Sequence, residues 1–108
     1  MDTVQLREAA ERLEREVAEA IAAGYENADC VLTSEVRALL PLIKAGRVTE
    51  PVRLQFRAGP AWNFFETRLG ERVQLQGAWH QFCWLIEDQD SDPLVQADRA
   101  RNPRGYEW

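Results

Sequence analysis

Apolar residues recur at intervals of three and four along the first segment of the chain, from Leu6 to Ile21. This period places them on one face of an α-helix. Asp2 and Gln5 have the spacing of a capping box, and Gly24 stands where a glycine commonly follows the last turn of a helix. The pattern predicts a helix over residues 3–23.

A second apolar stripe runs from Val36 to Ile43, and Gly46 marks its end. The stripe predicts a second helix that begins near Ser34. Pro41 lies inside it, where a proline removes one backbone hydrogen bond and clashes with the preceding turn. We therefore expect either a kink at Pro41 or two short helices.

The aromatic-rich segment after Pro60 divides into two amphipathic helices that meet near Gly70. Pro60 suits the first turn of the earlier helix, because its missing N–H would be unpaired there. The apolar side predicted for that helix holds Ala61, Trp62, Phe64, Phe65 and Leu69, and its polar side holds Asn63, Glu66, Thr67 and Arg68. The apolar arc predicted for the later helix holds Leu75, Ala78, Trp79, Phe82, Cys83, Leu85 and Ile86, with Val73 and Trp84 as outliers.

Residues 52–57 alternate strictly between apolar and polar side chains, which taken alone is the pattern of a β-strand. The alternative to an all-helical protein is therefore an α+β fold with two N-terminal helices and a C-terminal antiparallel meander. The helical periodicity of the later segments favours an all-α fold, a compact bundle of four to five helices. We expect one helical domain over residues 1–88 and a polar tail over residues 89–108, where no periodicity remains.

The composition of the 108-residue chain is that of an ordinary globular domain, with 45% apolar residues and a formal net charge of −5. An acidic surface repels nucleic acids and anionic membranes, so neither is an expected partner. The first residues have no basic stretch followed by an apolar run, and no apolar segment is long enough to span a bilayer. Two cysteines, Cys30 and Cys83, form no disulfide framework or metal motif. We expect a cytoplasmic protein.

Most catalytic signatures are absent from the sequence, and we expect no cofactor and no metal site. The single histidine, His80, falls on the polar side of its helix and could act as a general base beside Glu66 or Asp88. The spacing of Asp88, Asp90 and Asp92 mimics the start of a calcium loop, but the loop then lacks its glycine and its final glutamate. A solvated acidic turn is the better interpretation.

What remains is a surface suited to binding another protein. Acidic groups beside partly exposed aromatic side chains can meet a basic cleft, because complementary charge speeds association and aromatic anchors supply affinity. Trp84 is a candidate anchor because it falls on a polar arc, although a loop or the tail could cover it. The predicted partner-binding residues are Glu26, Asp29, Trp62, Glu66, Trp84, Asp88 and Asp90.

Several short motifs give the chain a resemblance to a known family. They are Ala-Gly-Tyr-Glu at residues 23–26, Ser-Glu-Val-Arg-Ala-Leu-Leu at 34–40, Phe-Phe-Glu-Thr at 64–67, and the spacing of Leu75, Ala78 and Trp79. In order and spacing over residues 3–82, the sequence resembles the small helical immunity proteins of type VI secretion systems that neutralise NAD(P)-degrading effector toxins. The resemblance implies an all-helical protein that binds its cognate toxin, occludes the active site and has no catalysis or cofactor of its own.

Three other functions stay open at this point. One is a phage-encoded inhibitor of a bacterial defence complex, which would need regularly spaced carboxylates. Another is a small enzyme that uses His80 as general base. The last is a structural subunit with Trp62 and Trp84 buried in a self-interface. The sequence does not decide between a monomer and a small homo-oligomer.

Overall fold

The computed structural model describes residues 2–55 and 58–88. They form four α-helices and two 3-10 helices, and these residues contain no β-strand. The elements in chain order are α1 (Thr3–Ala22), η1 (Glu26–Val31), α2 (Ser34–Lys44), α3 (Ala58–Glu66), η2 (Arg68–Glu71) and α4 (Val73–Ile86). The all-α prediction is confirmed, whereas the predicted tail over residues 89–108 lies outside the described residues.

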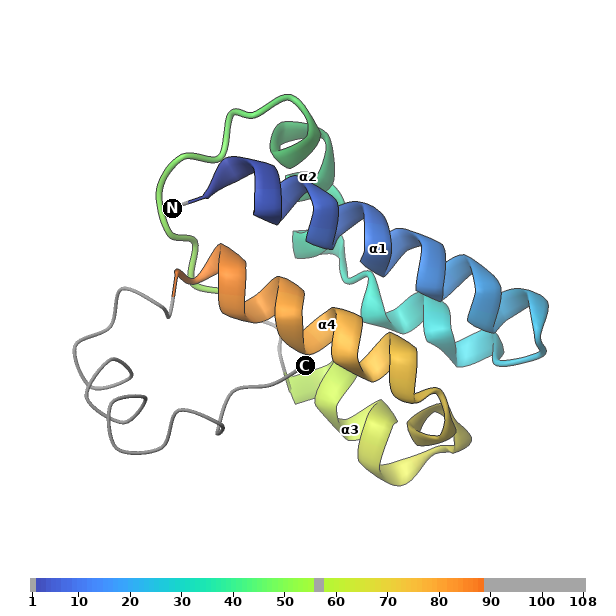
Figure 1. Cartoon of the computed structure of the whole chain (residues 1–108). Helices are drawn as coiled ribbons and strands as arrows, with labels where there is room; N and C mark the ends of the chain where they lie inside the picture. The colour runs from blue at the N-terminus through green and yellow to red at the C-terminus, as the bar shows by residue number, and fades with distance from the viewer. Residues whose placement is uncertain (1, 56–57, 89–108) are drawn as a thin grey trace, which may run out of the picture.

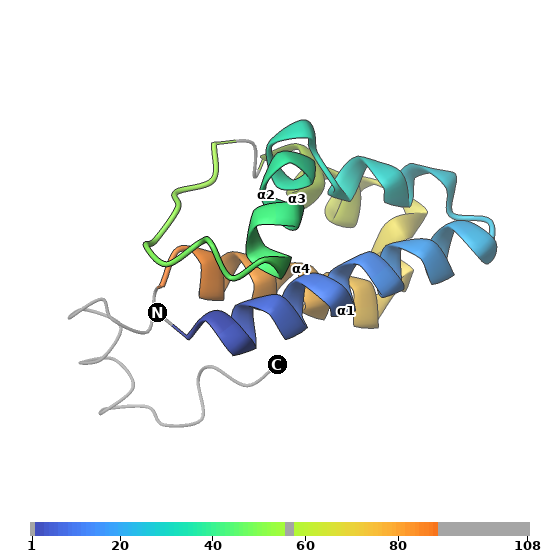
Figure 2. The same cartoon turned by 90° about the horizontal axis from the view of Figure 1, so that it is seen from above.

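Helices α1 and α4 form the centre of the bundle and run antiparallel, so that the start of α1 lies beside the end of α4 (Figures 1 and 2). Helix α2 and the 3-10 helix η1 also pack on α1, and α3 packs on η1 and η2. One continuous core fills the space between these elements. Its largest fully buried apolar side chains include Leu6, Leu13, Val17, Ile43, Leu69, Leu75, Phe82, Cys83 and Ile86.

The ends of α1 and α2 follow the signals in the sequence. Asp2 caps α1, and its Oδ1 accepts hydrogen bonds of 3.0 Å from the backbone N–H groups of Val4 and Gln5. Gly24 and Gly46 follow α1 and α2 with φ values of 98° and 71°. In this left-handed region a glycine ends a helix without the steric cost of a Cβ atom.

Helix α2 is a single helix that continues through Pro41. The prediction of two short helices is therefore wrong. Pro41 is an exposed residue in the last turns of α2, and its carbonyl accepts the backbone N–H of Ala45. The buried side chains of Val36, Leu40 and Ile43 hold the helix against the core on both sides of the proline.

The segment between α2 and α3 is extended but is not a strand over residues 52–55. The backbone N–H of Val52 donates to the carbonyl of Ile86 over 2.8 Å. Two carboxylates accept the next bonds, Glu87 from the Leu54 N–H over 3.3 Å and Glu35 from the Gln55 N–H over 2.9 Å. Leu54 is buried and Gln55 is exposed, so one-sided burial of an extended chain explains the alternating pattern. The α+β alternative is not supported in this region.

Candidate partner-binding surface

Helix α3 turns only part of its apolar side toward the core. Asn63 on α3 and Thr67, the residue just after it, face η1, where the Asn27 amide donates to the Thr67 hydroxyl over 2.8 Å and to the Asn63 side-chain oxygen over 3.5 Å. The Thr67 hydroxyl donates to the Asn63 carbonyl over 2.6 Å and accepts the backbone N–H of Leu69 over 3.2 Å. These bonds satisfy the half-buried polar groups and fix the rotation of α3.

The same rotation turns two aromatic side chains to the outside. Phe64 is buried, with 5% of its surface exposed, and its ring lies 5.7 Å from that of Trp79 in the core. Trp62 and Phe65 are 59% and 77% exposed. The hydrogen bonds to Asn27 hold the opposite side of the helix inward, so only part of the apolar side predicted for this segment reaches the core.

Glu66 directly follows Phe65 on α3, and further acidic residues lie on η1, which α3 contacts with its opposite side. Glu66 is exposed on α3, and Glu26 is exposed at the start of η1. Neither carboxylate forms a hydrogen bond or an ion pair within the part of the chain that the structure describes. Asp29, also exposed on η1, is instead paired with Arg37 of α2. We define the α3–η1 surface as the exposed residues Glu26 and Asp29 of η1 and Trp62, Phe65 and Glu66 of α3, two elements that are in contact.

Tyr25, which follows the end of α1, contacts three residues of η2 and its C-terminal end: Arg68, Glu71 and Arg72. The Tyr25 hydroxyl donates to Glu71 over 2.8 Å. The guanidinium groups of Arg68 and Arg72 lie 5.2 and 5.7 Å from the centre of the Tyr25 ring. Such cation–π contacts are worth about 0.5–1 kcal/mol each at exposed sites. Together with the bonds of Asn27, they keep η1, α3 and η2 in a fixed relation.

The predicted binding residues separate into two groups. Trp62 and Glu66 lie on α3, and Glu26 and Asp29 lie on η1, which α3 contacts through the side that bears Asn63. Trp84 and Asp88 lie at the end of α4 that is distant from η2, and both are half-buried. Asp88 has φ 50°, a left-handed conformation that aspartate tolerates just after a helix. Asp90 and Asp92 lie outside the described residues.

The residues considered for chemistry lie on α4 and η1. His80 is exposed on α4, with its ring 5.2 Å from that of Trp79 in an edge-on arrangement. Cys83 is buried in the core, as its position on the apolar arc predicts, and Cys30 is exposed on η1. Residues 2–55 and 58–88 contain no group of three or more His, Cys, Asp or Glu side chains placed to hold a metal ion. Nor does any helix among them have the length and apolar character needed to cross a membrane.

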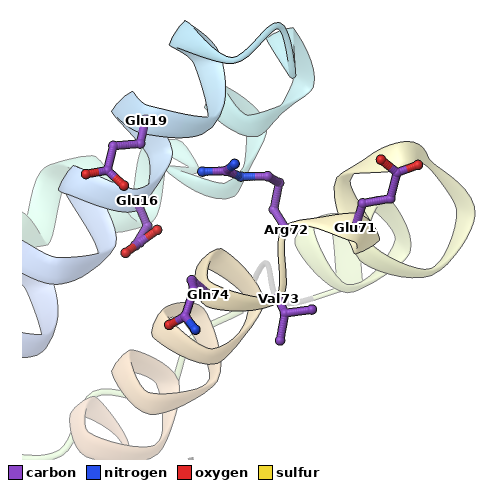
Figure 3. Close-up of a pocket in the computed structure, with 6 residues that line it drawn as sticks. All are labelled: Glu16, Glu19, Glu71, Arg72, Val73 and Gln74. Atoms are coloured by element: carbon purple, nitrogen blue, oxygen red, sulfur yellow. The ribbon is translucent and has the colours of Figure 1, made fainter.

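A shallow groove of about 320 Å³ lies between the second half of α1 and the start of α4 (Figure 3). Glu16 and Glu19 line its α1 side, and Gln74 lies across from them on α4. The Arg72 side chain reaches toward α1, whereas Glu71 and Val73 point away from the centre of the groove. The sequence pattern gave no indication of this groove, because its two walls are far apart along the chain.

Comparison of the chain with protein-family models, with curated proteins and with solved structures found no match.

Proposed function

We propose that this protein acts by binding another protein, as an immunity-type inhibitor that covers the active site of a cognate bacterial effector toxin. The observation that carries the proposal is the outward orientation of Trp62 and Phe65 on α3. In this proposal the protein performs no catalysis, needs no cofactor and functions through the α3–η1 surface.

Two exposed aromatic residues within one helical turn are not needed to complete this core. Phe64 alone supplies the ring with which α3 contacts Trp79. Single apolar residues are common on protein surfaces, whereas contiguous exposed apolar patches are often functional. Tryptophan in particular is enriched among the residues that contribute most to the affinity of protein interfaces.

The acidic character of the chain supports an inhibitory role. A formal net charge of −5 steers the protein toward a basic surface and disfavours nucleic acid as a ligand. Clefts that bind anionic substrates are commonly basic, and an acidic protein that docks over such a cleft would exclude the substrate. The resemblance of residues 3–82 to immunity proteins points to the same class of partner.

Neutralisation of a toxin in living cells tests this function. Proteins that co-purify with the tagged chain from its source cells would be identified by mass spectrometry, and each would be expressed alone in a test bacterium. We expect one of them to arrest growth, and co-expression of this protein to restore it. If no co-purified protein is toxic, or if co-expression fails to relieve toxicity, the inhibitor function is wrong.

A further inference from the structure

The exposed aromatic pair is unlike the other exposed apolar side chains of the described residues. Six large apolar residues are exposed there: Val4, Ile21, Leu42, Trp62, Phe65 and Val73. The four aliphatic ones lie singly, on α2, at the start of α4 and at the two ends of α1. Only Trp62 and Phe65 are separated by three positions on one helix, a spacing that makes side chains neighbours.

The two exposed rings supply only part of the area of a typical protein interface. Aromatic side chains bury about 150–250 Å² each, so at the observed exposure the two rings offer roughly 300 Å². A standard interface needs about 800 Å² from each partner. The partner must therefore also contact residues around the pair, and a concave apolar groove fits two rings that project from a helix.

Charge argues against a second copy of this chain as the occupant. Glu66 follows Phe65 directly and lies one helical turn after Trp62. A two-fold contact between two copies of α3 would bring these unpaired carboxylates toward each other. The charge of Glu66 favours a partner with cationic side chains beside its apolar groove.

We propose that α3 is an anchor helix that inserts Trp62 and Phe65 into an apolar groove of the partner, with Glu66 paired to a lysine or arginine on the rim of that groove. This inference rests on the proposed function and specifies the chemistry of its partner. The bonds from Asn27 hold α3 in the binding orientation before the partner arrives. A helix that is already ordered avoids part of the entropic cost of binding.

Site-specific photo-crosslinking in the source cells tests the position of the contact. The photoreactive residue p-benzoylphenylalanine would replace Trp62 or Phe65, and in matched controls it would replace Val4 or Val73, which are also exposed but lie on other elements. We expect positions 62 and 65 to crosslink to one protein, at a peptide that combines apolar residues with lysine or arginine. Positions 4 and 73 should give no such product.

Binding of the purified partner then tests each side chain. Trp62→Ala should weaken the affinity at least about 10-fold, as expected for a central aromatic anchor. Glu66→Lys should slow association at low salt, and the difference from the wild type should shrink at high salt. Val73→Ala, which removes an equally exposed apolar group elsewhere, should change the affinity less than about 2-fold. Circular dichroism would verify that every variant is folded.

The outcomes separate the two proposals. A partner that crosslinks from position 4 or 73 but not from 62 or 65 overturns the anchor helix and leaves the inhibitor function intact. Crosslinking from position 62 to another copy of this chain, or tighter binding by Glu66→Lys, also overturns the anchor helix. If no position captures a protein and none co-purifies, the proposed function itself is contradicted.

Discussion

A single methyl group added at Gly70 should destabilise the fold, because no space exists for it where η2 passes the end of α3. A Cβ atom at this position would lie 2.3 Å from the carbonyl oxygen of Phe64 and 3.4 Å from its carbonyl carbon. The nearest atom belongs to the backbone, so the clash cannot be relieved by a side-chain rotation, and η2 must move by about 1 Å. Overpacking of this kind typically costs about 1–3 kcal/mol, so we expect Gly70→Ala to lower the unfolding temperature by roughly 5–15 °C.

Gly77→Ala is the matched control within the same chain. Gly77 lies inside α4, and its added Cβ would meet only the Arg12 guanidinium at 3.8 Å, an ordinary contact distance. Since alanine favours a helix interior by about 0.8–1 kcal/mol over glycine, this variant should be more stable than the wild type. Thermal and urea unfolding followed by circular dichroism would measure both changes. The reasoning is refuted if Gly70→Ala unfolds within about 0.5 kcal/mol of the wild type, or if Gly77→Ala is the less stable of the two.

Three further substitutions test the packing and the polar contacts, each by urea unfolding. Phe82→Ala should lower the free energy of unfolding by about 3–5 kcal/mol, because Phe82 is fully buried. A loss of less than about 1 kcal/mol would contradict the position of Phe82 in the core. Asp2→Ala should cost about 1 kcal/mol and speed hydrogen exchange at Val4 and Gln5, while Asp2→Asn should behave like the wild type. Thr67→Val should lower the free energy of unfolding by about 1–3 kcal/mol, since it leaves the Asn27 amide without its closer acceptor. Thr67→Ser keeps the hydroxyl and should be more stable than Thr67→Val. Equal stability of the Val and Ser variants would count against the role of that hydroxyl in orienting α3.

The long helices could be predicted from sequence because their signals are local. The apolar stripe of α1, the cap at Asp2 and the glycine at position 24 placed its bounds within one residue of those observed. The apolar arc of α4 likewise matches its buried side chains, including Cys83. In both helices the hydrophobic face and the core-facing side largely coincide, with Ile21 at the end of α1 exposed, and periodicity is informative under that condition.

The segment before α3 was ambiguous because alternation reports burial and not strand pairing. An extended chain that lies with one side on a core shows the same period as a strand. The difference lies in the acceptors of the backbone N–H groups. Here the side chains of Glu35 and Glu87 take that role for Gln55 and Leu54, and such distant carboxylates leave no mark on the local pattern.

Which part of the apolar side of α3 faces the core could not be predicted, because a distant residue decides it. Asn27 lies 36 positions before Asn63 and 40 before Thr67, so no local pattern shows that these polar groups have a partner. Once they are satisfied on the inside, the aromatic residues on the opposite side are left exposed. A helix whose local pattern conflicts with its packing is commonly a functional element. Trp62 and Glu66 were identified from the sequence as binding residues, but Phe65 was not.

Parallel affinity purification from the source cells, with wild-type and variant baits, tests the central claim most directly. The baits would be the wild type, the double variant Trp62→Ala and Phe65→Ala, and the control Val73→Ala, all confirmed to be folded. If the α3–η1 surface binds a partner, the wild type and Val73→Ala will retain one protein in stoichiometric amount, and the double variant will lose it. Retention of the same protein by all three baits, or of none by the wild type, would contradict the account.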